Sequence, residues 1–378
     1  MKFVLAPDSF KESMTSKEVC NAMTEGIRKV FSNAEIIAVP MADGGEGTMQ
    51  SMIDSTNGTI YSEIVKGPLG RDIKAQFGIL GDKNTAIVEA AEACGLQLVD
   101  KSLRNPLITT TYGVGQLIKS ALDMNINKLI ITLGGSSTND GGVGMLQALG
   151  VKFLDEKDEE ISFGGAFLSK IRKIDISMID KRIKNIEIKA ACDVKNHLTG
   201  DKGASRVFAK QKGASEEDIV MLDNNLKHYA NVVKEQYGID IDNVEGAGAA
   251  GGLGAAVTGF LGGKLENGFS IVSQCCNLES KMKNADFVIT GEGSIDSQTK
   301  EGKTPYGVAK TAKKFYIPVI ALCGRSGEGI EELYEEIDSI VCIVPGAVAL
   351  EDALKNGKIN ITRTMENICR IIKISKNL

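Results

Sequence analysis

The chain has few histidines and no paired cysteine motif. Its 378 residues include two histidines, His197 and His228, and eight cysteines without a Cys-x-x-Cys spacing. A zinc site needs clustered cysteine and histidine ligands, and a hydrolytic triad needs a histidine with a suitable partner, so we expect neither. Scattered cysteines are typical of a reducing compartment, so a cytoplasmic location is expected.

Excess positive charge and long apolar runs are also missing. The net charge is −5, and no basic patch interleaved with aromatic residues occurs, so we expect no nucleic-acid or anionic-membrane partner. The uncharged stretch Gly246–Gly263 is rich in glycine and alanine rather than strongly apolar, which favours a packed helix over a membrane span. A strand-like run, Lys2–Leu5, starts directly at the N-terminus, so no signal peptide is expected.

Five apolar, strand-like runs end abruptly in glycines, hydroxyls and a carboxylate, and a helix-like segment follows each. They are Val4–Ala6, Ile36–Val39, Leu129–Leu133, Phe287–Thr290 and Val319–Leu322. In a parallel sheet the carboxyl ends of the strands share one edge, where ligands bind. Glycines let backbone N–H groups approach an anion there, and helix N-termini add a positive dipole end. This layout indicates an enzyme that handles phosphate.

Short alternating segments around turns interrupt the pattern in two regions, 57–108 and 151–163, and predict antiparallel pairing. We therefore predict an α/β fold with a discontinuous, Rossmann-like parallel-sheet domain and a second, inserted mixed α/β domain. The first would comprise 1–56, 109–150 and 275–378, and the second 57–108 and 151–274. Active sites often lie between domains, so we expect this one in the interdomain cleft.

Capping residues and apolar periodicity predict the main helices. A Thr15/Ser16 cap precedes one helix, Ser215 precedes a long amphipathic one, and proline stands early in another. The expected helices are Ser16–Phe31, Thr111–Leu122, Glu216–Gln236 and Pro305–Phe315.

Two phosphate-binding motifs occur out of context. Gly246–Gly251 matches Gly-x-Gly-x-x-Gly, but the residues before it are polar rather than strand-like, so close packing is the better interpretation. Gly302-Lys303-Thr304 resembles the end of a Walker loop, but Ser297 replaces the required glycine. A lysine that reaches a phosphate from a helix start, or an exposed loop lysine, fits better.

Carboxylates form the most informative set. Each one alone is commonly a turn former or a helix cap. Together they repel one another unless metal or lysine neutralises them, and phosphoryl transfer uses Mg²⁺, positive groups and often an aspartate base. The set is Asp8, Asp43, Asp140, Asp193, Glu292 and Asp296, with Lys11, Lys195, Lys210, Lys212 and Lys303 near in sequence.

Ordered motifs along the whole chain resemble the type I, bacterial glycerate kinase family. They are Ala6–Lys11, Ala42–Thr48, Thr110–Gly115, Gly134–Gly142, Ala191–Val194, Gln211–Ala214 and Thr290–Asp296, followed by Gly302-Lys303. The resemblance implies ATP-dependent phosphorylation of D-glycerate, typically to 2-phospho-D-glycerate, in glycerate, glycolate or sugar-diacid catabolism. It also implies a two-domain α/β structure and the use of Mg²⁺. Glu12 departs from the pattern, because glycine is usual there, which puts the shape of that loop in doubt.

On this basis we assign candidate roles to residues. Asp193 is the first choice for general base or metal contact, followed by Asp43 and Asp8, and a planar arginine suits a substrate carboxylate. The catalytic candidates are Asp193, Asp43, Asp8 and Lys11. The substrate-binding candidates are Ser9, Lys11, Arg71 and Thr111. The ATP- and phosphate-binding candidates are Gly134, Gly135, Ser136, Ser137, Asn139, Asp140, Gly291, Glu292, Gly293 and Lys303. The metal candidates are Asp193 and Asp296.

Three alternatives stay open at this stage. The enzyme could phosphorylate the 3-position of glycerate, since the residues do not fix the regiochemistry. A nicotinamide-dependent hydroxy-acid dehydrogenase also needs a glycine-rich sheet edge, and a sensor of small carboxylates needs an anion pocket. The expected partners are glycerate and ATP, and the sequence leaves a homodimer open.

Overall fold

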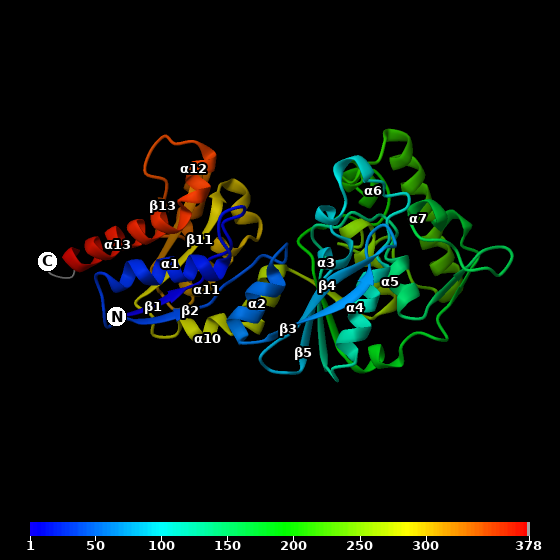
Figure 1. Ribbon diagram of the computed structural model, residues 1–378, viewed down its shortest axis with the longest axis horizontal. Helices are drawn as coiled ribbons and strands as arrows, with labels where there is room; N and C mark the ends of the chain where they lie inside the picture. The colour runs from blue at the N-terminus through cyan, green and yellow to red at the C-terminus, as the bar shows by residue number, and fades with distance from the viewer. Residues whose placement is uncertain (376–378) are drawn as a thin grey trace. The chain divides into compact units, whose positions relative to one another are not determined.

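The computed structural model of the chain describes residues 1–375, which form two compact units (Figure 1). Unit 1 comprises Met1–Asp43, Gln50–Asn57 and the chain from Phe269 onward. Unit 2 comprises Gly44–Met49 and Gly58–Gly268. Both units are therefore assembled from separate stretches of the sequence.

Unit 1 contains a five-stranded sheet in which all neighbouring strands run parallel, in the order β13-β12-β11-β1-β2. Because the strands are parallel, the segments that follow their carboxyl ends gather at one edge. The strands are β1 (Lys2–Leu5), β2 (Glu35–Ala38), β11 (Phe287–Ile295), β12 (Val319–Ser326) and β13 (Ser339–Cys342).

Helices α1 and α13 lie side by side in unit 1, as their blue and red ribbons show in Figure 1. α1 begins after Thr15, whose side chain forms a capping box with Glu18. Gly26 allows close approach, because a Cβ there would lie 2.6 Å from the carbonyl oxygen of Thr362 in α13. The helices of this unit are α1 (Ser16–Arg28), α2 (Thr48–Thr56), α9 (Gly268–Cys275), α10 (Leu278–Met282), α11 (Thr304–Lys313), α12 (Leu350–Lys355) and α13 (Gly357–Ser375), with α2 and α9 starting at the unit boundary.

Unit 2 contains a six-stranded mixed sheet in the order β10-β9-β6-β5-β4-β3. β5, β6, β9 and β10 run parallel, whereas β3, β4 and β5 pair antiparallel. The strands are β3 (Thr59–Lys66), β4 (Asp72–Ile79), β5 (Thr85–Glu89), β6 (Lys128–Thr132), β9 (Glu187–Ala191) and β10 (Lys264–Glu266), and β7 (Lys152–Leu154) and β8 (Lys173–Asp175) form a separate pair.

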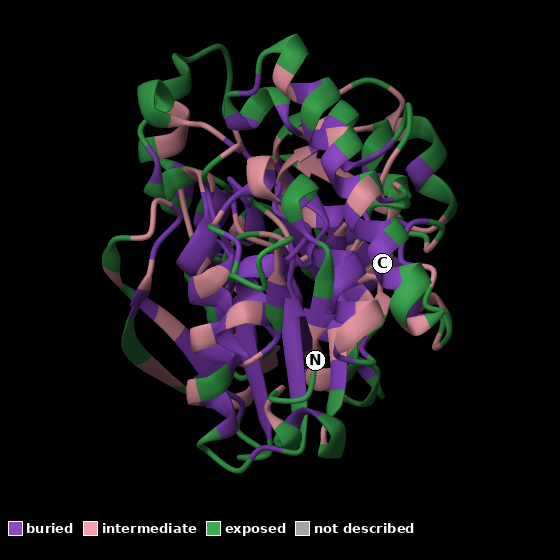
Figure 2. Ribbon diagram, turned by 90° about the vertical axis from the view of Figure 1, so that its right-hand side faces the viewer, coloured by how far each residue is buried: buried purple, intermediate pink, exposed green. Residues whose placement is uncertain are grey.

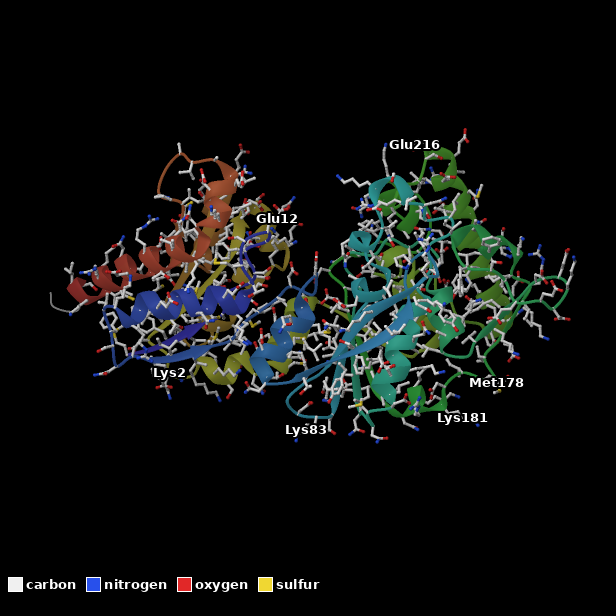
Figure 3. All side chains as sticks on the ribbon, viewed as in Figure 1. Lys2, Glu12, Lys83, Met178, Lys181 and Glu216 are labelled. Carbon is white, nitrogen blue, oxygen red and sulfur yellow. The ribbon has the colours of Figure 1, made fainter. Side chains whose placement is uncertain are left out.

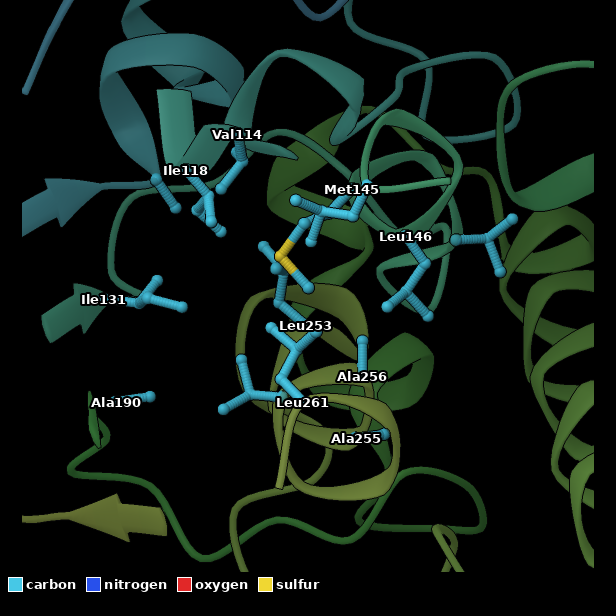
Figure 4. Close-up of a cluster of buried hydrophobic side chains, with 14 of the residues drawn as sticks. Val114, Ile118, Ile131, Met145, Leu146, Ala190, Leu253, Ala255, Ala256 and Leu261 are labelled. Atoms are coloured by element: carbon cyan, nitrogen blue, oxygen red, sulfur yellow. The ribbon is translucent and has the colours of Figure 1, made fainter. Parts of the chain in front are cut away.

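The helices of unit 2 enclose a large apolar core. In Figure 2 the strands are mostly buried, while the outer segments carry the exposed residues. Figure 4 shows how Ile131 of β6, Met145 and Leu253 meet in that core. The helices are α3 (Ala91–Cys94), α4 (Tyr112–Leu122), α5 (Val143–Ala148), α6 (Ala204–Phe208), α7 (Glu216–Tyr237) and α8 (Leu253–Phe260), and Ser215 caps α7 as its sequence predicts.

The α/β class, the parallel sheet and the mixed sheet are confirmed, but the predicted domain division differs from the two units. Segment 109–150 belongs to unit 2, because β6 pairs with β5 and β9 rather than with the terminal strands. Gly44–Met49 also belongs to unit 2, and unit 1 resumes at Phe269 rather than at residue 275. A parallel strand ending in glycines suits either sheet, so its motif could not reveal its neighbours. The expected cleft site stays a prediction.

Two local expectations also differ. Gly291-Glu292-Gly293 is part of β11 rather than a loop, since the β11–β12 ladder continues to Ile295 and Ser326. The return segment of the hairpin expected in 151–163 makes a single bridge, Leu154 to Glu160, and β7 pairs instead with β8.

The described helices of residues 1–375 include none with the length and apolarity that a bilayer crossing requires.

We predict that Gly113→Ala destabilises the protein by about 2 kcal/mol, since overpacking of this size is typical of tight sites. A Cβ at Gly113 would lie 1.9 Å from the carbonyl oxygen of Lys66. Urea unfolding measures the change, with Gly346→Ala as the control, because nothing lies within 4 Å of a Cβ there. Equal stability of the two variants would contradict this packing.

Candidate active site

Acidic side chains gather at the carboxyl edge of the unit 1 sheet. Asp8 follows β1, and its N–H donates to the carbonyl oxygen of Gly291 at 2.8 Å, so the chain continues alongside β11 beyond the end of the strand. Leu5 of β1 pairs with Ile289 of β11. Asp8, three residues after Leu5, therefore stands level with Glu292, three residues after Ile289. We call Asp8, Glu292 and the nearby Asp43 the carboxylate row.

Asp8 is held by two donors yet is costly to ionise. Its carboxylate accepts hydrogen bonds from the N–H of Ser9 at 2.6 Å and from Oγ1 of Thr304 at 2.5 Å. Burial, and then the negative charge of Asp43, raise its pKa to about 6, even though these hydrogen bonds act in the opposite direction. Ionising Asp8 in this buried position therefore costs free energy.

Glu292 is also costly to ionise. Burial raises its pKa to about 7, Asp8 and Asp43 add to the rise, and Lys303 and Thr299 oppose it. Oγ1 of Thr299 donates to Glu292 at 2.8 Å, and Nζ of Lys303 lies 3.9 Å from it.

Lys303 is shared between two acidic groups. Its Nζ is 4.0 Å from Oδ1 of Asp296 as well as 3.9 Å from Glu292. Lys303 precedes α11 and is half-buried, so its ammonium is placed at a helix start that also offers positive dipole. Asp296 accepts from the N–H of Gln298 at 3.0 Å, which fixes the turn before this helix.

The loop after Asp8 contains Ser9 and Lys11, and Gly293 of β11 lies beside it. A Cβ at Gly293 would be 3.6 Å from the backbone nitrogen of Lys11. Lys11 is exposed, and the next residue, Glu12, adopts a positive φ of 62° in an exposed turn (Figure 3). Glycine avoids the steric cost of that conformation, which explains why the departure at Glu12 bears on loop shape.

In unit 2 the glycine loop after β6 is tightly packed. A Cβ at Gly134 would lie 3.3 Å from Cα of Gly45, and Gly135 has a positive φ of 75°. The N–H and the hydroxyl of Ser137 both donate to the carbonyl oxygen of Cys94, at 2.8 and 2.9 Å. Gly134 and Gly135 remain partly accessible, whereas Ser136, Ser137 and Asn139 are buried.

Asp140 and Thr111 are brought together as a buried pair. Asp140 accepts from the N–H and the hydroxyl of Thr111, both at 2.8 Å, and from the N–H groups of Gly142 and Gly144. The Thr111 hydroxyl in turn accepts from the N–H of Met145. These bonds join the starts of α4 and α5, so both side chains shape the loop.

Lys212 is the buried cation of unit 2. Its Nζ donates to Oγ of Ser136 at 3.0 Å and to the carbonyl oxygen of Thr138 at 2.6 Å. Burial lowers its pKa to about 8, while Cys94 and Asp140 act to raise it. A lysine is almost never buried unless paired, so it indicates a local need for positive charge beside this loop.

Asp193 follows β9, and hydrogen bonds orient its exposed side chain. Its Oδ1 accepts from Nδ2 of Asn267 at 2.6 Å and from the N–H of Gly268 at 3.0 Å. A Cβ at Gly44 would lie 3.5 Å from its Oδ2, so this glycine packs beside the carboxylate. Arg71 lies elsewhere in unit 2, exposed in the turn between β3 and β4.

Three further positions, one acidic and two hydroxyl-bearing, were missing from the predicted site. Glu89 ends β5 and accepts from the N–H groups of Gly47 and Met49, at 3.0 and 3.2 Å, so it holds the Gly44–Met49 segment. Its position after an apolar run is the signal that could have identified it. Thr304 and Thr299 carry no such signal, because threonine at a helix start is common.

Gly246–Gly251 serves packing, as its sequence context indicates. A Cβ at Gly251 would lie 2.1 Å from the carbonyl oxygen of Thr138, directly behind the glycine loop. The segment leads into α8 without a preceding strand.

Unit 1 carries carboxylates and a lysine at a helix start beside its parallel sheet, and unit 2 carries a glycine loop after β6; each of these parts suits an α/β phosphotransferase. Comparison with known proteins specifies the class. The profile of the glycerate kinase family matches residues 3–373. The chain therefore belongs to the glycerate kinase family, and it is an enzyme of that class.

Individual relatives agree over the full length. The chain is 48% identical to the glycerate kinase of Bacillus subtilis (strain 168), covering 100% of this chain and 99% of that protein. It is 48% identical to the glycerate 2-kinase of Escherichia coli (strain K12), covering 99% and 98%. A crystal structure assigned to a glycerate kinase 2 of Salmonella typhimurium LT2 has a TM-score of 0.93 and 44% identity, with full coverage of both chains.

We predict that Lys212→Met loosens the glycine loop, because it removes the ammonium that donates to both Ser136 and Thr138. Amide hydrogen exchange of residues 134–140 should speed up about tenfold, which corresponds to roughly 1.4 kcal/mol of lost local stability. Lys210→Met is the control, since Lys210 is exposed and pairs at the surface with Glu216. Unchanged exchange in Lys212→Met would show that the loop does not depend on this ammonium.

Proposed function

We propose that the chain transfers the terminal phosphoryl group of ATP to the 2-hydroxyl of D-glycerate and forms 2-phospho-D-glycerate. Family membership supports ATP-dependent phosphorylation of glycerate. A relative named glycerate 2-kinase, 48% identical over nearly the whole chain, favours the 2-position. The observation that carries the proposal is the carboxylate row, in which burial and mutual repulsion raise the pKa values of Asp8 and Glu292 beside the ammonium of Lys303.

The row fits Mg²⁺ together with nucleotide phosphates. Hard oxygen ligands suit this ion, which typically binds one or two carboxylates and completes its shell with phosphates and waters. Residues 1–375 contain no preformed group of three or more metal-binding side chains. Asp8, Glu292 and Asp296 are the proposed contacts in unit 1, and Asp193 is the one in unit 2. When bound, Mg²⁺ neutralises charge that develops on the phosphates.

Two groups of residues would bind the phosphates of ATP. Lys303 supplies a half-buried ammonium at the start of α11, beside Gly291 and Gly293 of β11. Gly134 and Gly135 supply accessible backbone at the end of β6. Thr111, Ser137, Asn139 and Asp140, all buried, would act by shaping the second group.

Asp193 is the proposed general base that accepts the proton of the glycerate hydroxyl. Hydrogen bonds from Asn267 and Gly268 orient its Oδ1, and the residue is exposed, so it can reach a substrate. Asp43 and Asp8 are the second and third candidates. Ser9, Lys11 and Arg71 are proposed to bind the carboxylate and hydroxyls of glycerate, since arginine and lysine pair with carboxylates.

The wider role follows from the same family. We propose that the enzyme serves the catabolism of glycerate, glycolate or sugar diacids and works in the cytoplasm, which its scattered cysteines favour. A homodimer stays a prediction.

Phosphorus NMR of the product tests the proposed reaction. The protein is incubated with Mg-ATP and D-glycerate, and we expect the phosphorus resonance of 2-phosphoglycerate. The resonance of 3-phosphoglycerate would overturn the proposed position, and consumption of neither substrate would overturn the proposed reaction. Glycerate-dependent reduction of a nicotinamide without ATP would favour the dehydrogenase alternative.

Asp193→Asn should lower kcat roughly 10²-fold or more, because a positioned general base contributes about 10²–10⁴ in rate. The amide keeps the shape of the carboxylate but cannot accept the proton. Steady-state kinetics with D-glycerate and Mg-ATP measures the loss, and Asp201→Asn, at an exposed position of the same unit, is the control. Wild-type kcat in Asp193→Asn would pass the role of base to Asp43 or Asp8.

Glu292→Gln should stabilise the free protein at alkaline pH while it impairs catalysis. The folded-state pKa of Glu292 is raised from 4.5 to about 7, so ionisation opposes folding and its cost grows as the pH rises between these values. We expect a gain of at most roughly 3 kcal/mol above about pH 8 and almost none near pH 4.

Urea unfolding at both pH values measures this difference, with Glu328→Gln as the exposed control in the same unit. A variant less stable than the wild type at alkaline pH would show that Glu292 is already neutralised by its neighbours.

A further inference from the structure

The carboxylate row continues across the unit 1 sheet as a pair of cysteines. Glu292 of β11 pairs in register with Cys323 of β12, and Cys323 pairs in register with Cys342 of β13. Residues paired across neighbouring strands project from the same face of a sheet, so the three side chains stand in one line. Burial chiefly raises the pKa of Cys323, and Cys342 and then Glu292 add to the rise.

The two thiols differ in access. Cys323 is fully buried, and its Sγ lies 3.8 Å from the carbonyl oxygen of Val341 on β13. Cys342 is exposed on β13, which is an edge strand of the unit 1 sheet (Figure 1). Its Sγ donates to the carbonyl oxygen of Gly324 at 3.2 Å. Each thiol thus points at the other's strand.

We propose that Cys323 and Cys342 are an oxidative modification site that forms a reversible disulfide within the chain. Adjacent strands lie about 4.8 Å apart, which falls inside the Cα separation of about 4.4–6.8 Å that a disulfide spans. Neither backbone segment has to move far. The proposal does not rest on the kinase reaction.

The chemistry balances with a low-molecular-weight disulfide as the oxidant. The Cys342 thiolate attacks one sulfur of glutathione disulfide and releases one reduced glutathione. The Cys323 thiol, after losing its proton, attacks the Cys342 sulfur of that mixed disulfide and releases the second. Two protein thiols lose two electrons and two protons in all, and two glutathione thiols gain them.

The order of attack follows from exposure. Cys323 is fully buried, so a low-molecular-weight disulfide does not reach its sulfur directly. Cys342 is accessible to the oxidant and reacts first. An exposed, edge-strand disulfide is of the labile kind, so glutathione or dithiothreitol should reduce it again.

Thiol mapping of the native protein tests the proposal. The reduced protein is incubated with glutathione disulfide, remaining thiols are blocked with N-ethylmaleimide, and the digest is analysed by mass spectrometry. We expect a cross-linked peptide pair that contains Cys323 and Cys342 and is lighter by two hydrogen atoms, and its loss after dithiothreitol. Cys342→Ser should abolish the cross-link, and Cys275→Ser, at a half-buried cysteine outside the pair, should retain it.

Three results would overturn the proposal. Cys323 could be recovered fully alkylated while Cys342 carries only glutathione, which would show that the second attack does not occur. Cys342 could link two chains instead, visible as a dimer on a non-reducing gel. The same mass loss could persist in Cys342→Ser, which would place the oxidation elsewhere. Because the readout is the thiols, failure here leaves the proposed kinase reaction untouched, and failure of the kinase reaction leaves this test intact.

Discussion

Crowding of negative charge at the edge of a parallel sheet is the constraint on which the unit 1 site depends. The topology brings Asp8 level with Glu292, and both are buried enough that ionisation is costly. Lys303 opposes this charge but is shared with Asp296. A fold that only had to be stable would gain nothing from such a set, because an unneutralised buried carboxylate costs free energy. A cation that arrives with the nucleotide would remove that cost, which ties the geometry to phosphoryl transfer.

In unit 2 the buried charged groups beside the glycine loop are satisfied by hydrogen bonds within the unit. Its glycine loop after β6 is shaped by a buried acid, Asp140, which four donors satisfy, and by the buried ammonium of Lys212. Preorganised backbone of this kind does not have to rearrange when an anion binds. The loop is therefore preorganised for an anion, whereas the proposed role of the carboxylate row is to bind a cation together with the nucleotide.

Much of the fold followed from sequence, because strand ends, caps and glycines have local causes. Thr15 and Ser215 cap their helices as predicted, and Asp8 follows β1 as predicted, whereas Glu292 lies within β11 rather than after it. The placement of 109–150 did not follow, since β6 owes its place to pairing with β5 and β9, which are distant in sequence. For the same reason the sequence could not separate Asp140, a buried structural acid, from Asp193, an exposed one. The burial of Lys212 and the hydroxyl of Thr304 on Asp8 depend on tertiary contacts that no local pattern records.

Proton release on binding of Mg-ATP tests the central claim most directly. Titration calorimetry at about pH 6.5, repeated in buffers that differ in ionisation enthalpy, counts the protons that leave the protein when a metal binds its carboxylates. Asp8 and Glu292 are partly protonated at this pH, because their pKa values are raised to about 6 and about 7. The account predicts net proton release that shrinks towards zero above about pH 8, where both groups are already ionised. Binding without proton release at about pH 6.5, or with proton uptake, would contradict it.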